Sequence, residues 1–91
     1  MAIAALLEFA NITPEQYDAV IADMGLNGKP AAHGIFHVAG PIDGGWRIVD
    51  VWDSVEAFND FAQSQIMPLA QKHGLKEPPQ VSVWPVHNML K

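Results

Sequence analysis

Cysteine is missing from this chain of 91 residues, and charged side chains and long apolar runs are scarce. The absence of cysteine excludes a disulfide framework, a thiolate nucleophile and a cysteine-ligated zinc site, and it fits a protein of the reducing cytoplasm. Only 16% of the residues are charged, and 5 Lys and Arg residues stand against 10 Asp and Glu. A net charge of −5 offers no surface for a phosphate backbone or an anionic membrane, so neither is an expected partner.

No hydrophobic run approaches the ~20 residues that a transmembrane helix needs. The N-terminal stretch MAIAALLEFA is apolar, but it lacks a basic region and reaches Glu8 too early for a signal peptide, so a strand over Ile3–Phe9 is predicted. The composition is nevertheless 49% hydrophobic. We therefore expect one compact domain over residues 1–91 with its own core.

Residues 33–54, HGIFHVAGPIDGGWRIVDVWDS, have the pattern of a β-hairpin. Two runs of β-branched and aromatic residues flank Asp43-Gly44, a strong signal for a type I′ turn, which needs positive φ at both central residues. This turn predicts that His37 pairs with Asp50, and the other predicted pairs are Ala39–Ile48, Phe36–Val51 and Ile35–Trp52. Because side chains alternate across a sheet, one face then carries Ile35, His37, Ile48, Asp50 and Trp52, and the other carries Phe36, Val38, Val49 and Val51.

A first helix is predicted from Pro14 onward. Thr13 is a suitable N-cap, proline is favoured at the first helical position, and Gln16 completes a capping box three residues after the cap. Gly25 can adopt the left-handed conformation that ends a helix.

A second helix is predicted after the hairpin, with Asp53 as its N-cap and Glu56 as the capping-box partner. We expect a kink or restart near Met67, because Pro68 lacks the backbone donor that a continuous helix needs. The last predicted strand covers Gln80–Asn88, and Pro85 within it indicates an edge strand or a bulge.

The predicted element order is βαββαβ, which is the ferredoxin-like α+β fold: a four-stranded antiparallel sheet with two helices on one face. The other face of the sheet is left bare, although the hairpin places apolar side chains on it. A homodimer that packs through this sheet face is the simplest way to cover them.

His37 opposite Asp50 is the predicted catalytic pair. A carboxylate beside an imidazole fixes its tautomer and favours its protonated form, which suits a general base near neutral pH. A purely structural ion pair is the alternative.

Four further residues are predicted to bind a ligand, because aromatic rings line pockets for planar apolar molecules: Trp46, Trp52, Phe58 and His87. Packing in the core or at an interface is the alternative for each. No metal site is predicted. His33 and His37 lie four residues apart on one strand, which is about 13 Å, so they cannot bind one ion together.

The run RIVDVWDSVEAFNDF and the closing strand VSVWPVHNML resemble the antibiotic biosynthesis monooxygenase-like members of the dimeric α/β-barrel superfamily. The resemblance covers essentially the whole chain. It implies two subunits packed sheet to sheet into a barrel, with a ligand pocket between sheet and helices. Members include cofactor-independent monooxygenases that act on polycyclic aromatic phenols, lactone isomerases and haem-degrading enzymes.

The haem-degrading members pair a pocket tryptophan, which Trp52 matches, with a helix histidine near the position of His73 and an asparagine in the first strand. No asparagine lies between Ile3 and Phe9 in this chain. The resemblance therefore gives no reason to expect haem, and no cofactor is predicted.

Two hypotheses of different class follow. The first is a small cofactor-independent enzyme of the monooxygenase or isomerase kind, which uses His37 and Asp50 on an aromatic or other apolar small molecule. The second is a non-catalytic dimeric module that binds an apolar small molecule or serves only as a structural partner.

Overall fold

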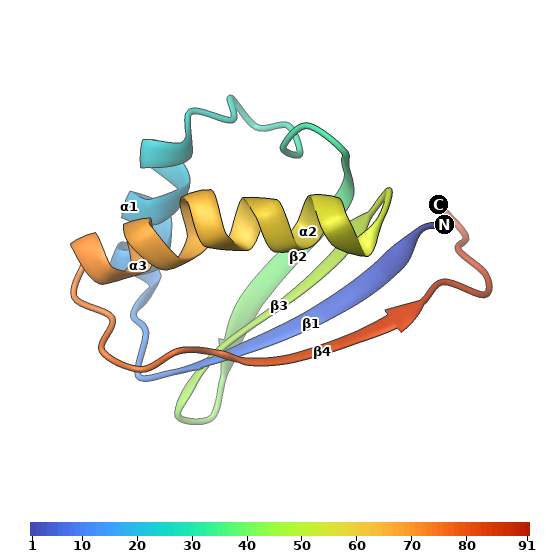
Figure 1. The fold of residues 1–91 in the computed structure, drawn as a ribbon. Coiled ribbons are helices and arrows are strands. Elements are labelled where there is room, and N and C mark those ends of the chain that lie inside the picture. The colour runs from blue at the N-terminus through green and yellow to red at the C-terminus, as the bar shows by residue number, and fades with distance from the viewer.

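The structure is a computed structural model that describes residues 1–91. Its strands form one antiparallel sheet in the order β2-β3-β1-β4, and the helices lie on one face of it (Figure 1). The predicted ferredoxin-like α+β fold is confirmed. The elements in chain order are β1 (Ile3–Ala10), α1 (Pro14–Met24), β2 (Gly34–Ile42), β3 (Gly45–Trp52), α2 (Val55–Phe61), α3 (Met67–Lys72) and β4 (Gln80–Pro85).

The core lies between the sheet and the helices and is built from alternate residues of the two central strands. On β1 these residues pair directly with β3 residues of the same face, as Leu7 does with Ile48 and Phe9 with Trp46. Leu7 is 1% exposed. Because strand side chains alternate, every second residue of β1 and β3 points at the helices, and these make up most of the buried cluster: Ile3, Ala5, Leu7, Phe9, Trp46 and Trp52.

The predicted hairpin register is confirmed in its central part. His37 pairs with Asp50, and the pairs Phe36–Val51 and Ala39–Ile48 also form. The prediction is wrong at Ile35, because a bulge makes Gly34 the partner of Trp52. A bulge inserts one extra residue and ends strict alternation, so Ile35 does not occupy the predicted position opposite Trp52.

The hairpin turn is also different from the prediction. Asp43-Gly44 does connect the strands, with Ile42 pairing with Gly45. Only Gly44 has a positive φ, of 75°, and Asp43 does not. A type I′ turn requires positive φ at both residues, whereas glycine alone at the second position is the sign pattern of a type II turn. The type I′ prediction is therefore wrong.

The predicted start and end of α1 are confirmed. The Thr13 hydroxyl accepts from the Gln16 backbone N–H at 3.1 Å, and the Gln16 side chain accepts from the Thr13 backbone N–H at 2.9 Å. Gly25 ends the helix in the left-handed region, with φ 68°.

The N-cap of α2 is Ser54 and not Asp53 as predicted. The Ser54 hydroxyl accepts from the Ala57 backbone N–H at 3.1 Å. Asp53 instead turns to His33: its backbone N–H donates to the His33 carbonyl at 2.9 Å, and its carboxylate lies 3.3 Å from the His33 ring. Asp53, which the local sequence favours as the N-cap, is thus engaged by His33 at the start of the hairpin, and Ser54 caps the helix instead.

The expected interruption near Met67 is confirmed. A π-helical turn over Ala62–Ile66 joins α2 to α3, and Pro68 sits in the first turn of α3. The three pieces run across the sheet as one rod in Figure 1. None of the helices has the length and hydrophobicity that crossing a membrane requires.

The last strand is shorter than predicted, because β4 ends at Pro85 and not at Asn88. It is an edge strand, as Pro85 indicated. Beyond it, the Val86 backbone N–H donates to the Ala2 carbonyl at 3.0 Å, and the two termini lie close together in Figure 1.

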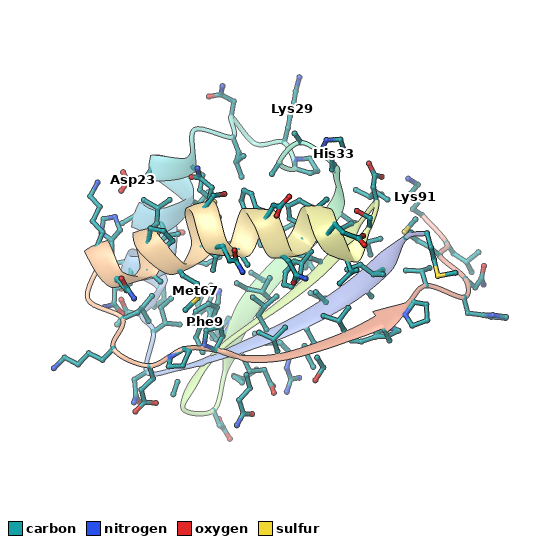
Figure 2. All side chains as sticks on the ribbon, viewed as in Figure 1. Phe9, Asp23, Lys29, His33, Met67 and Lys91 are labelled. Carbon is teal, nitrogen blue, oxygen red and sulfur yellow. The ribbon has the colours of Figure 1, made fainter.

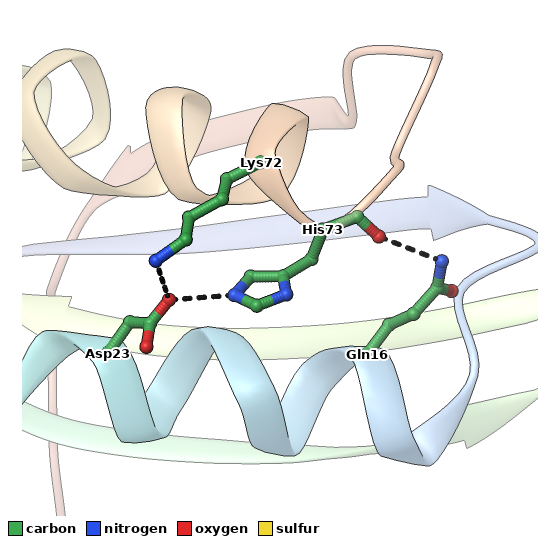
Figure 3. Close-up of polar contacts among 4 residues, drawn as sticks. All are labelled: Gln16, Asp23, Lys72 and His73. Atoms are coloured by element: carbon green, nitrogen blue, oxygen red, sulfur yellow. Dashed lines mark hydrogen bonds and ion pairs between the residues drawn. The ribbon is translucent and has the colours of Figure 1, made fainter.

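Polar contacts tie α1 to α3 (Figure 3). The Asp23 carboxylate binds Lys72 Nζ at 2.9 Å and His73 Nε2 at 2.7 Å, and the Gln16 side-chain amide donates to the His73 carbonyl at 3.1 Å. Hydrogen bonds from His73 and then Lys72 lower the pKa of Asp23. A lowered folded-state pKa stabilises the fold above the unfolded-state pKa, and this stability is lost as pH falls through the folded-state pKa.

We expect Asp23→Asn to lower the melting temperature modestly at neutral pH and not at acid pH, where the parent carboxylate is itself protonated. Thermal unfolding followed by circular dichroism at several pH values measures this. Asp60→Asn is the control, because Asp60 is exposed on α2 and makes no side-chain hydrogen bond. An equal loss at all pH values would show that the charge of Asp23 does not stabilise the helix pair.

Candidate functional site

A cavity of about 280 Å³ lies between the sheet and the helices. This volume is near the lower end of those typical of small-molecule sites, which is about 300 Å³. Its wall is mostly apolar, and Figure 2 shows that side chains occupy the layer between the sheet and the helices. The sheet contributes Leu7, Ile48 and Trp52, and α1 contributes Val20, Ile21 and Met24. The helical segment that runs from α2 to α3 contributes Phe61, Ile66 and Ala70.

Polar groups are few in this wall, and four residues that carry them belong to one hydrogen-bonded chain: Tyr17, His37, Asp50 and Trp52. Asp50 is buried on β3, with a side chain 7% exposed, and its Oδ1 lies 2.6 Å from His37 Nδ1. Its other oxygen accepts from Trp52 Nε1 at 3.2 Å. Trp52 can reach Asp50 because residues two apart on a strand share a face. Both carboxylate oxygens are therefore occupied and the carboxylate is held in place.

Tyr17 extends this chain into the cavity wall. Its hydroxyl lies 2.5 Å from His37 Nε2, and the two rings are nearly parallel, with 6.1 Å between their centroids. A carboxylate only accepts hydrogen bonds, so Nδ1 of His37 carries the proton toward Asp50 and Nε2 of the neutral ring accepts from the Tyr17 hydroxyl. Tyr17 was not predicted as a site residue. It lies within the predicted first helix, and no local pattern links it to His37.

Burial raises the pKa of Tyr17, and the negative charges of Asp50 and then Asp18 raise it further. The phenol is therefore kept protonated through the neutral range. A raised folded-state pKa gives stability that is fully present below the unfolded-state pKa and is lost as pH rises through the folded-state pKa.

This shift can be measured directly, because Tyr17 is the only tyrosine of the chain. We expect its ultraviolet absorbance to titrate above the ordinary tyrosine value of about 10. Asp50→Asn should lower the midpoint partway, since it removes the negative charge that raises the pKa of Tyr17 most, and Tyr17→Phe should reduce the alkaline loss of stability. A midpoint at the ordinary value would mean that the phenol is open to solvent.

Of the other predicted site residues, the aromatic ones lie in or near the cavity wall and His87 does not. Trp52 lines the cavity. Trp46 is buried and packs against Tyr17 of the cavity wall, with ring centroids 5.0 Å apart. Phe58 is buried behind Trp52 in an edge-to-face contact at 6.1 Å. His87 lies elsewhere: it lines a hollow with Val51 and Trp84, away from His37. Its predicted place depended on a strand to Asn88, and β4 ends before it.

No group of three or more His, Cys, Asp or Glu side chains is placed to hold a metal ion. His73, the helix histidine considered for haem, is hydrogen-bonded to Asp23 and is not among the cavity-lining residues. The cavity therefore offers an apolar wall and one acid–base chain. An imidazole between a carboxylate and a phenol can take up a proton, because the carboxylate stabilises the imidazolium that results.

No family model and no curated protein sequence matches the chain. Solved structures do match. A variant of SnoaB, a cofactor-independent oxygenase from Streptomyces nogalater, superimposes with a TM-score of 0.65 at 17% identity over 98% of this chain and 96% of that one. A candidate antibiotic biosynthesis monooxygenase from Chloroflexus aurantiacus gives 0.68 at 15% identity over 100% and 98%.

A hydroxynitrile lyase from Passiflora edulis gives a TM-score of 0.59 at 19% identity over 98% of this chain and 97% of that one. The same fold thus carries different reactions, and likeness at this identity concerns the fold. The resemblance found in the sequence is confirmed at that level: this chain has the fold of the antibiotic biosynthesis monooxygenase-like proteins.

Proposed function

We propose that this protein is a cofactor-independent monooxygenase that acts on an aromatic small molecule in the cavity between the sheet and the helices. The observation that carries the proposal is the hydrogen-bonded pair of His37 and Asp50 in an otherwise apolar wall. The apolar wall favours a planar ring system, and Trp52 offers an aromatic surface for it. The relatives of the same fold include a cofactor-independent oxygenase, which supports this kind of reaction.

The chemistry needs only a proton acceptor and dioxygen. The proton of an activated methylene or of the conjugated hydroxyl passes to the acid–base chain and ends on His37, and the resulting anion is electron-rich enough to reduce dioxygen. One oxygen atom becomes the carbonyl oxygen of the product. The other leaves as water with the two hydrogen atoms of the methylene, so atoms and electrons balance without a reductant. Asp50 stabilises the imidazolium while the proton is held there.

Oxygen uptake with anthrone tests the proposal, because anthrone carries a methylene between two aromatic rings. We expect uptake of one dioxygen per anthrone, faster than in buffer and faster than with His37→Ala. Ile21→Val is the matched control, since it alters the cavity wall and not the acid–base chain. Binding without faster uptake would overturn the monooxygenase proposal and favour a non-catalytic binding module. Absence of binding would favour a structural module.

We also propose that the protein is a homodimer that packs through the bare sheet face. This face carries exposed apolar side chains on two strands: on β2 Phe36 is 45% exposed and Val38 51%, and on β4 Trp84 is 45% exposed. Ordinary monomers rarely expose a continuous apolar surface of this kind. A second copy of the chain offers the same apolar surface in return, as a two-fold interface requires.

Sedimentation at micromolar concentration is expected to give the mass of two chains. Val38→Glu should convert the dimer to a monomer, because it places a charge on the apolar sheet face where Val38 pairs with Val49. Val55→Glu is the control: Val55 is also exposed, but it lies at the start of α2. A monomeric parent protein, or equal effects of the two variants, would contradict the sheet-face dimer.

A further inference from the structure

Both ring nitrogens of His37 are already engaged. Nδ1 faces the Asp50 carboxylate at 2.6 Å, and Nε2 faces the Tyr17 hydroxyl at 2.5 Å. A neutral imidazole has one N–H and one lone pair. The N–H is directed to Asp50, and the lone pair accepts from Tyr17. No lone pair of the ring is left to accept a proton directly from a molecule in the cavity.

The oxygen of Tyr17 does have capacity left. A phenol donates one hydrogen bond and can still accept another. Tyr17 lines the cavity, its hydroxyl contacts the imidazole of His37, and its ring packs against the indole of Trp46 with 5.0 Å between centroids. Its oxygen is therefore held against His37 on one side while the same side chain borders the space that a ligand would fill.

The tyrosine works as a hydroxyl and not as a phenolate. Burial and the nearby Asp50 and Asp18 raise the pKa of Tyr17 and oppose its loss of a proton. A phenol whose ionisation is disfavoured can still pass a proton on, provided that it gains one proton as it loses another. The 2.5 Å contact between the Tyr17 hydroxyl and His37 Nε2 lets Tyr17 give its own proton to His37 as it takes another from the ligand.

We propose that Tyr17 is the catalytic residue that contacts the substrate and that it relays the substrate proton to His37. As the substrate O–H bond breaks, its proton bonds to the Tyr17 oxygen, and the original Tyr17 proton bonds to Nε2 of His37. The substrate becomes an anion, His37 becomes an imidazolium beside Asp50, and Tyr17 is unchanged overall. This inference rests on the proposed function of the cavity. It names the Tyr17 oxygen as the atom that accepts the proton, and it specifies a substrate with an acidic hydroxyl on an aromatic or enolic ring.

Anaerobic binding of para-nitrophenol tests the relay, because its phenol and phenolate absorb at different wavelengths and dioxygen takes no part. With the parent protein, below the pH at which the free compound ionises, we expect bound phenolate and an NMR signal of the His37 imidazolium. Tyr17→Phe keeps the ring but removes the oxygen. It should bind the compound while the phenolate fraction falls about tenfold or more. Asp53→Asn should behave as the parent, because Asp53 is exposed and lies outside the cavity wall.

The outcomes separate the relay from the proposed function. Full ionisation by Tyr17→Phe, with His37 protonated as before, would overturn the relay and leave His37 as the direct base. Binding without ionisation by the parent protein would overturn the acid–base function itself.

A second measurement covers the case in which Tyr17→Phe does not fold. Since the chain has one tyrosine, growth with fluorotyrosine labels this site alone. We expect the fluorine NMR signal to shift with para-nitrophenol and much less with para-nitroanisole, which has no acidic proton. Equal shifts would overturn the contact between Tyr17 and the acidic hydroxyl.

Discussion

Replacing Gly45 with alanine is expected to destabilise the protein by about 3 kcal/mol or more. Gly45 pairs with Ala10 at the end of the β1–β3 ladder. A Cβ at Gly45 would collide with the Phe9 carbonyl oxygen and lie 3.1 Å from the Phe9 carbonyl carbon and 3.3 Å from Ala10 Cα. All three are backbone atoms of the central strand, so relief requires the two strands to separate.

Gly40→Ala is the matched control for this prediction. Gly40 also lies in the hairpin, but a Cβ there would meet no atom within 4 Å. Its stability should change by at most about 1 kcal/mol, because no atom is displaced and alanine restricts the unfolded chain, which acts in favour of the folded state. Urea unfolding of both variants measures the difference. Equal stabilities would mean that β1 and β3 are farther apart at this end than the structure has them.

The fold could be predicted from the sequence where the signals are local. The capping box of Thr13 and Gln16, the break before Pro68 and the central hairpin register each depend on residues close in sequence, and each is confirmed. The predictions failed where a distant contact competes with a local preference. Asp53 is a good N-cap by type, yet His33 binds it and Ser54 takes the cap.

The candidate site shows the same division. The pairing of His37 with Asp50 followed from counting along two strands of one hairpin. The bulge at Ile35 did not, because nothing in the sequence marks where strict alternation stops. Tyr17 could not be assigned either: it reaches His37 only because α1 crosses this part of the sheet, and sequence periodicity does not give a crossing position.

The largest functional effect is expected from the His37 and Asp50 pair. His37→Ala removes the group that stores the proton. Asp50→Asn keeps the size of the side chain but removes the charge that stabilises the imidazolium. Each variant should slow anthrone-dependent oxygen uptake by about a hundredfold or more, and the double variant should be little slower than either, because groups that serve one step are not additive.

A structural pair predicts the opposite pattern. His37→Ala leaves the buried Asp50 carboxylate without one of its two hydrogen-bond donors, which costs about 1–3 kcal/mol of stability. If the pair serves only the fold, the variants lose melting temperature while ligand binding and oxygen uptake per folded protein stay at the parent level. Assays therefore have to be run well below the melting temperature of the weakest variant.

The chain contains its own control for this comparison. His33 and Asp53 form a second imidazole–carboxylate pair at the ends of the same hairpin, but their side chains are 70% and 56% exposed and lie outside the cavity wall. An exposed pair of this kind contributes little to stability. Asp53→Asn should thus leave oxygen uptake unchanged while Asp50→Asn removes most of it. If the two substitutions have equal effects on uptake, the cavity is not the place where the proton is taken, and the assignment of His37 and Asp50 to the reaction is wrong.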